Sequence, residues 1–431
     1  MVSACAGGIP AVPPGQQAKT VTGFAVVGTT LTLDAAGQTL QLTARLLYGD
    51  GTFDDESSKA AWVSSNTAVA TVSSNGFVAA VDDGSTTVTA TYEGRSASQI
   101  VTVHIDQQFN WTFLGSIFTT GVNDVGVYDI IVDPRDDQLL YVASDRGVFV
   151  SRNQGATWTQ GFATPRTGNH PGVLAQDATN PDRVFYGGDG VLRISTDKGL
   201  TWSALKDFPP NAIASITASR FDRRAFFVGV SGPSNPGVFR SVDDGATWES
   251  HAFPYPVSGA TAFIPWSIGE DPGDGTLYVT TELSDHPQPY HPPAFRSVDR
   301  GLSWQDVTGA LPWHGQKIIV QPKTGQVYFL TEGSGLFTST DHGLSWTRLG
   351  NAIFANTLTI DPNNLAQFFG GELVDSKTSR GGGAFLSTDG AVTFNPYGLE
   401  GRIVSSLSVS GDSARLFAAC YNSGIFVRRL R

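Results

Sequence analysis

Short apolar runs, each closed by a turn rich in Gly, Asp or Asn, recur along the chain from about residue 126 to its end. One unit reads as apolar runs at 317–320, 327–330 and 336–339, then a polar turn, then a further run at 346–349. Runs of this length between turn residues predict β-strands, and no helical period is sustained. Six such four-strand units follow one another, and a seventh, beginning at Ser406, lacks its turn and fourth strand.

The polar turn is an eight-residue motif, S-x-D-x-G-x-[TS]-W, that returns at intervals of about 42 to 56 residues, as in repeat architectures. Asp tolerates tight turns and binds nearby backbone amides, Gly supplies a positive φ, and Trp buries a large surface. The motif therefore predicts a hairpin clasp with a structural role. Four copies, starting at Ser195, Ser241, Ser297 and Ser339, keep Ser, Asp, Gly and Trp together. The copy at Ser151 has Asn153 in place of the Asp, and the copy at Ser387 is degraded and ends in Phe394.

An isolated strand precedes the first unit. Residues 110–115 (NWTFLG) match 345–350 (SWTRLG) at Trp, Thr, Leu and Gly, yet no other strand of a unit stands before them. Pairing this strand with the incomplete seventh unit would leave no open sheet edge. The sequence thus predicts a seven-bladed propeller whose last blade is completed by an N-terminal outer strand.

The repeated turn resembles the Asp box of sialidases, xyloglucanases, sortilin-type receptors and photosystem-assembly propellers. That resemblance implies the propeller fold and boxes that lie away from the functional face. Sialidase activity is not expected, because the sequence has no Arg-Ile-Pro segment. In the xyloglucanases, the resemblance implies an acid and a base on opposite walls between two propellers, whereas this sequence contains one propeller.

Residues 20–105 predict a separate β-sandwich of short alternating strands. The stretch 62–80 (WVSSNTAVATVSSNGFVAA), followed by Gly84 and 87–90 (TVTA), resembles the bacterial group 2 Ig-like domain. The resemblance implies a spacer or adhesive module, with a core that rests on packing around Trp62 because no cysteine pair is available. The predicted fold class is all-β: a tether at 1–19, an Ig-like domain at 20–105 and the propeller at 106–431.

Composition and cysteine usage limit the classes of binding partner and indicate where the protein is located. The net charge of −11 disfavours nucleic acid and anionic membrane surfaces. Cys420 lies in an apolar strand and is expected to be a buried free thiol. Cys5 ends a segment that resembles a bacterial lipobox, and 7–17 reads as a flexible tether, so we expect an extracellular or outer-surface location with membrane contact only through a lipid on Cys5. The alternative is a chance cysteine in a flexible tail.

Candidate binding residues cluster on the face that carries the blade-to-blade connections and the second-to-third-strand loops, opposite the Asp boxes. Two of these loops, 281–293 and 372–383, are long, as binding loops often are. Their spacing of His and Asp fits no recognised metal signature, and no cofactor motif is present. The candidate ligand-binding residues are Trp266, Glu282, Asp285, His286, Tyr290, His291, Trp313 and His314, and the candidate catalytic residues are Asp285, Glu372 and Asp375.

A second candidate lies on the inner strands. At the position just before the buried apolar residue of each inner strand, Asp129 and Lys317 are charged, whereas the residues at the same position in the other units are mostly small or polar. These two belong to the first and fifth units, nearly across the channel. They predict a ligand pole inside the central channel, the alternative being two solvated channel charges.

These features favour non-catalytic recognition of a glycan or of a protein partner through the loop-rich face. The alternative is a glycoside hydrolase or lyase acting on a polysaccharide. A glycosidase needs two carboxyl groups roughly 5 to 10 Å apart, and no sequence spacing pairs the candidates in that way. Nor does the sequence contain a nucleophile elbow or a Gly-rich phosphate loop.

Overall fold

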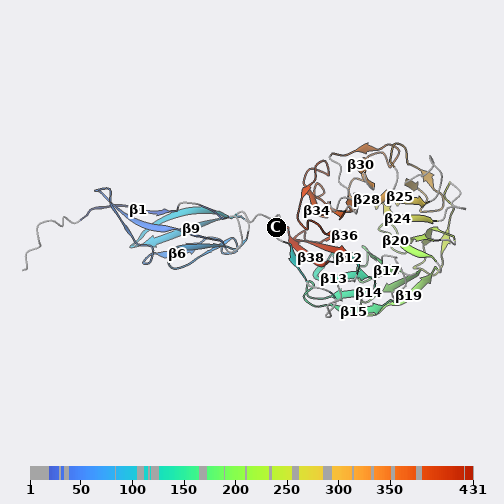
Figure 1. Cartoon of the computed structure of the whole chain (residues 1–431), viewed down its shortest axis with the longest axis horizontal. Helices are drawn as coiled ribbons and strands as arrows, with labels where there is room; N and C mark the ends of the chain where they lie inside the picture. The colour runs from blue at the N-terminus through green and yellow to red at the C-terminus, as the bar shows by residue number, and fades with distance from the viewer. Residues whose placement is uncertain are drawn as a thin grey trace, which may run out of the picture. The chain divides into compact units, whose positions relative to one another are not determined.

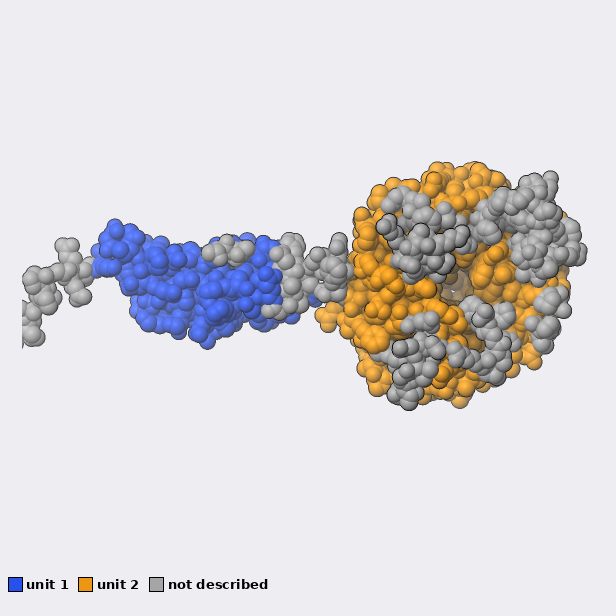
Figure 2. Space-filling model, in the orientation of Figure 1, with its two compact units in different colours: residues 1–107 blue, residues 108–431 orange. Residues whose placement is uncertain are grey.

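In the computed structural model, the chain divides into two compact units, residues 1–107 and 108–431 (Figure 2). The structure describes residues 19–430 apart from 29–30, 34–37, 83, 104–110, 115–116, 118–125, 165–171, 189, 209–210, 233–234, 255–261, 285–293, 313–314, 332–333, 351–354, 375–380 and 422. Every regular element in the described part of the chain is a β-strand.

The first unit is an Ig-like sandwich of three small sheets. They consist of β1 (Val21–Val27), β4 (Thr43–Tyr48) and β5 (Phe53–Asp55); β2 (Thr32–Leu33), β10 (Arg95–Val103), β9 (Gly84–Tyr92) and β6 (Ala61–Ser64); and β3 (Thr39–Gln41), β8 (Phe77–Ala80) and β7 (Ala70–Val72). Alternate residues such as Leu42, Val78 and Val88 are fully buried. Trp62 packs against this core and donates its indole N–H to the Ser57 carbonyl at 2.8 Å. The core of the sandwich thus rests on side-chain packing around Trp62.

The second unit is a propeller of seven four-stranded antiparallel sheets (Figure 1). The inner strands are β12 (Val127–Asp133), β16 (Val173–Gln176), β20 (Ala212–Ala218), β24 (Ala262–Glu270), β28 (Gly315–Val320), β32 (Ala355–Ile360) and β36 (Ile403–Val409). The second strands are β13 (Asp136–Ser144), β17 (Val184–Gly188), β21 (Phe226–Ser231), β25 (Leu277–Ser284), β29 (Val327–Thr331), β33 (Phe368–Val374) and β37 (Arg415–Tyr421). The third strands are β14 (Gly147–Ser151), β18 (Val191–Ser195), β22 (Gly237–Ser241), β26 (Ala294–Ser297), β30 (Gly335–Ser339), β34 (Gly381–Ser387) and β38 (Gly424–Arg429). The outer strands are β15 (Thr159–Ala163), β19 (Ser203–Asp207), β23 (Glu249–Ser250), β27 (Gln305–Asp306), β31 (Thr347–Arg348), β35 (Asn395–Pro396) and β11 (Thr112–Phe113).

The ring closes as the sequence predicts, because the N-terminal strand β11 supplies the outer strand of the seventh blade. Thr112 and Phe113 pair with Val427 and Phe426 of β38, and the Leu114 amide donates to the Ile425 carbonyl at 2.9 Å. The indole N–H of Trp111 donates to the carbonyl of Tyr397 in the sixth blade, at 2.7 Å. The first strand of the propeller therefore ties together its last two blades.

The Asp boxes are structural clasps. In the fifth blade, the Ser339 hydroxyl donates to Asp341 Oδ1 at 2.7 Å and accepts from the Gly343 amide at 2.8 Å, while Asp341 accepts from the amide and the hydroxyl of Ser345. His342, between them, has a left-handed φ of 58°. The degraded copy at Ser387 keeps the same hydroxyl–carboxylate contacts through Asp389, so the clasp survives loss of the Trp.

These contacts predict an acid-sensitive fold. Hydrogen bonds from threonine hydroxyls, followed by backbone amides, lower the pKa of Asp197, Asp243 and Asp389 to about 2. Because an unfolded Asp titrates near 3.9, the stabilisation is complete above about pH 4 and is lost as the pH falls towards 2. Thermal melts followed by circular dichroism should therefore show a falling melting temperature over this interval. The double variant Asp197→Asn, Asp243→Asn should flatten that slope, and an unchanged slope would contradict the prediction.

Candidate functional site

The strand register defines one face of the propeller, opposite the Asp boxes. The strand ends on this face form the loop-bearing edge of the blades. Each inner strand begins where the second strand of its blade ends, so Ile264 pairs with Glu282, Ala355 with Glu372, and Ile403 with Tyr421. The blade connections and second-to-third-strand loops start from this edge. Glu282 and Glu372, from the fourth and sixth blades, are both half-buried there.

A bulge recurs near this edge in six of the inner strands within the described residues, always one residue before the position equivalent to Asp129. A bulge leaves one residue outside the ladder and turns its side chain away from the regular direction. The bulged residues are Tyr128, Ala214, Trp266, Gln316, Asn356 and Ser405. Aromatic side chains thus occupy the bulge in the first and fourth blades.

In the fourth blade, the bulge joins an aromatic ring to a carboxylate. The Trp266 indole N–H donates to Glu282 Oε2 at 2.7 Å, and both side chains are half-buried. The hydrogen bond orients the carboxylate, and a partly exposed indole beside it can receive an apolar face of a ligand. The sequence-based hypothesis named both residues, and the structure brings them into contact.

A pair of aromatic rings lies at the same edge, where the first and last blades meet. The rings of Tyr128 and Tyr421 have centroids 5.6 Å apart and planes tilted by 45°. Gly126 makes this pair possible, since a Cβ there would come within 2.8 Å of both rings. Sequence reasoning missed the pair. The signal was the equivalence of Tyr128 to Trp266, which becomes visible only when the bulge is known.

The central channel holds the two charged residues that the sequence singles out. Asp129 and Lys317 line the same cavity of about 650 Å³. Burial raises the pKa of Asp129, against hydrogen bonds from the Ser406 hydroxyl and the Leu174 and Ile130 amides at 2.7 to 2.9 Å. Since Leu174 and Ser406 belong to neighbouring blades, Asp129 ties three blades together. A ligand at the Asp129 and Lys317 pole stays a prediction.

Some of the remaining sequence-based expectations concern described residues, and the others concern residues that the structure does not describe. Cys420 is a buried free thiol, as expected, and burial raises its pKa to about 12. No helix with the length and apolarity of a membrane span occurs in the part of the chain that the structure describes. The residues of the other expected sites lie outside the described residues: Cys5, Asp285, His286, Tyr290, His291, Trp313, His314 and Asp375.

Comparison with known proteins supports both halves of the fold. Residues 20–103 match the bacterial Ig-like domain (group 2). A solved structure described as YCF48 from Cyanidioschyzon merolae superposes with a TM-score of 0.51 at 16% identity, covering 74% of this chain and 98% of that one. Its low identity makes this a likeness of fold alone. An Ig-like domain followed by a propeller is therefore the architecture of this chain.

The curated relatives bear on activity. A xyloglucanase of a Paenibacillus species is 28% identical over 244 residues, covering 51% of this chain and 20% of the relative. A xyloglucanase of Hypocrea jecorina is 25% identical over 302 residues, covering 55% and 34%. The chain thus spans about a fifth to a third of the length of these relatives.

These relatives overturn the expectation of a non-catalytic recognition protein. Their names are those of glycoside hydrolases, which was the alternative interpretation of the sequence. The expectation rested on two arguments: the sequence contains one propeller, and no sequence spacing pairs the candidate carboxyl groups. The second argument was unsound, because catalytic groups in a propeller can come from different blades, so their separation in sequence carries no information about their separation in space.

Proposed function

We propose that this chain is a glycoside hydrolase that acts on a xyloglucan-type polysaccharide at the edge carrying Trp266, Glu282 and Glu372. The observation that carries the proposal is the similarity to xyloglucanases over half the chain. The described geometry supports it with two carboxylates and two aromatic groups at one edge of the propeller.

The chemistry requires one carboxyl group to protonate the glycosidic oxygen and a second to activate water or to attack the anomeric carbon. We take Glu282 and Glu372 as the candidates for these two roles. The indole of Trp266 and the paired rings of Tyr128 and Tyr421 would hold sugar rings, whose apolar faces stack on aromatic surfaces. Bound in this way, a polysaccharide would lie across several blades.

The direct test is incubation of the full chain with xyloglucan, with unsubstituted mixed-linkage β-glucan and xylan as comparison substrates. We expect new reducing ends from xyloglucan, and mass spectrometry of the products should give discrete oligosaccharides. A preparation of the double variant Glu282→Gln, Glu372→Gln controls for contaminating hydrolases. Equal release by the wild type and the double variant, or no release from any of the three glycans, would contradict the proposal.

A further inference from the structure

A ring of buried polar side chains marks the ends of the inner strands on the Asp-box side of the propeller. Four of them are aspartates whose Oδ1 accepts from the amide two residues later, at 2.8 to 2.9 Å. The seven equivalent residues, each at most 6% exposed, are Asp133, Asp177, Ser219, Asp271, Gln321, Asp361 and Ser410. Because this turn buries a negative charge in several blades, each junction with the next blade needs a compensating group.

Arginine pairs with an aspartate at each of the first three junctions. Arg135 contacts Asp133 at 2.9 Å, and Arg183 contacts Asp177 at 3.2 Å. At the third junction, where the ring residue is the neutral Ser219, Arg300 pairs with the partly exposed Asp222. Arg300 occupies the left-handed position of the next Asp box, between its Asp and its Gly, with a φ of 61°.

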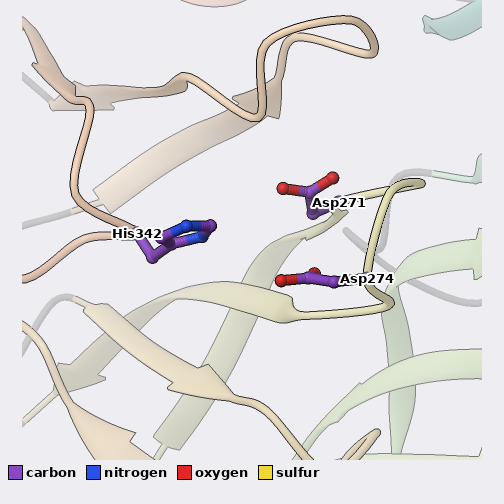
Figure 3. Close-up of side chains that lie close together, drawn as sticks. All are labelled: Asp271, Asp274 and His342. Carbon is purple, nitrogen blue, oxygen red and sulfur yellow. The ribbon is translucent and has the colours of Figure 1, made fainter.

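At the junction between the fourth and fifth blades, no Lys or Arg pairs with Asp271 among the described residues. The equivalent Asp361 of the sixth blade also has no such partner there, but it accepts from the Ser413 hydroxyl of the seventh blade. His342 takes the box position that Arg300 holds at the previous junction, and Asp274 adds a second carboxylate. One potential ligand atom from each of Asp271, Asp274 and His342 lies within 4.8 Å of the others. Figure 3 shows the imidazole facing both carboxylates. The nearby Arg296 instead donates to the His342 carbonyl and to Gln305.

One member of this cluster and one neighbour are buried. Asp271 is 6% exposed, and its Oδ2 would lie 2.6 Å from a Cβ at Gly325 of the fifth blade, whose positive φ suits glycine. The neighbour, Tyr278, is fully buried, and its hydroxyl has no hydrogen-bond partner among the described residues. Its ring edge lies 3.4 Å from the Cβ position of Gly343, next to His342. Burial, followed by the charges of Asp271 and Asp274, raises the pKa of Tyr278.

The first junction shows what such a hydroxyl faces when the charge is compensated. Tyr141, the equivalent tyrosine, is also buried, and its hydroxyl has no hydrogen-bond partner among the described residues. Its charged neighbours are two carboxylates, of Asp133 and Asp182, and two guanidinium groups, of Arg152 and Arg135. In the fourth blade, three carboxylates near Tyr278, those of Asp271, Asp274 and Asp341, face a single guanidinium, that of Arg296.

We propose that Asp271, Asp274 and His342 bind a divalent transition-metal ion that links the fourth blade to the fifth. Two carboxylate oxygens and one imidazole nitrogen form a donor set suited to Zn²⁺, with water as a fourth ligand. The ion would supply positive charge to the carboxylates at this junction, as Arg135 does for Asp133 and Arg300 does for Asp222. The site lies on the opposite side of the propeller from Glu282 and Glu372, so it is independent of the proposed hydrolysis.

The test is calorimetric titration of ZnCl₂ into the full chain after chelator treatment, together with thermal melts with and without Zn²⁺. Wild-type protein should bind Zn²⁺ at this site and melt at a higher temperature when loaded. His342→Asn and Asp274→Asn should each weaken that binding by about tenfold or more, because each removes one ligand of three. Both side chains are exposed, and Asn tolerates the left-handed backbone at 342.

Lys198→Asn is the matched control, since Lys198 holds the same box position at the first junction, with a φ of 58°. It should bind Zn²⁺ as the wild type does. The proposal is overturned if the wild type binds no Zn²⁺, or if its binding and its Zn²⁺-dependent melting shift are unchanged in His342→Asn and Asp274→Asn. The second outcome would assign the ion to other groups of the chain.

Discussion

Replacing Trp111 by alanine should lower the free energy of unfolding of the propeller by about 2–4 kcal/mol and open its seventh blade. The indole is half-buried against Tyr397, and its N–H donates to the Tyr397 carbonyl at 2.7 Å. Removing it costs apolar contact and one of two side-chain hydrogen bonds to the Tyr397 carbonyl, which also accepts from Arg428 at 2.9 Å. Denaturant unfolding of the full chain, followed by Trp fluorescence and circular dichroism, measures the loss.

A matched variant separates ring closure from the general loss of a tryptophan. Trp346 has the same place in its strand, and its indole donates to the Val307 carbonyl at 2.7 Å, but its blade is continuous in sequence. Trp346→Ala should cost a similar free energy without exposing a free strand edge. Limited proteolysis should therefore cut Trp111→Ala faster than Trp346→Ala at the C-terminal strands. Equal cleavage would show that β11 does not control closure.

The fold was accessible to sequence reasoning because its main determinants are local. Each Asp box forms its hydrogen bonds within eight residues, so its letters alone predict the clasp. Closure required only that the isolated strand around Trp111 match the outer strand around Trp346, as it does at four positions. Buried residues such as Ile130, Ile268 and Leu407 follow the predicted inner-strand positions for the same reason.

The sites were harder to predict because their members come from different blades. The Tyr128 and Tyr421 pair depends on a bulge, which arises from how one strand meets its partner and leaves no mark in composition. Asp271 and His342 meet only because consecutive blades place one turn beside the next box. Trp266 and Glu282 were both named as candidates, but their hydrogen bond could not be derived from their spacing.

The largest effect on activity is expected from the two carboxylates at the loop-bearing edge. Glu282→Gln and Glu372→Gln should each lower kcat on xyloglucan by about 10²- to 10⁴-fold, the usual contribution of a general acid or base. Gln keeps the shape of the side chain, and at 282 its amide oxygen can still accept from Trp266. Glu249→Gln, on an exposed outer strand, is the matched control and should leave kcat unchanged.

Comparing the activity of each variant on two substrates shows which carboxyl group is the acid and which is the base or nucleophile. An aryl glycoside with a good leaving group needs no protonation as its bond breaks, so the variant that lacks the acid should recover much of its activity on that substrate. The variant that lacks the base or nucleophile should stay inactive on both substrates. Trp266→Phe, which removes the hydrogen bond to Glu282 but keeps an aromatic ring, should reduce kcat by about tenfold through loss of orientation.

These results would also locate the active site. If Glu282→Gln and Glu372→Gln both keep full activity while the wild type hydrolyses xyloglucan, the reacting carboxyl groups lie elsewhere in the chain. If only one of the two variants loses activity, its partner comes from a different position, and the aryl glycoside then tells which role that partner plays. Loss in both, with unchanged melting temperatures and the contrasting responses to the aryl glycoside, would place the reaction between the fourth and sixth blades, because each variant keeps its fold and differs only in one carboxyl group.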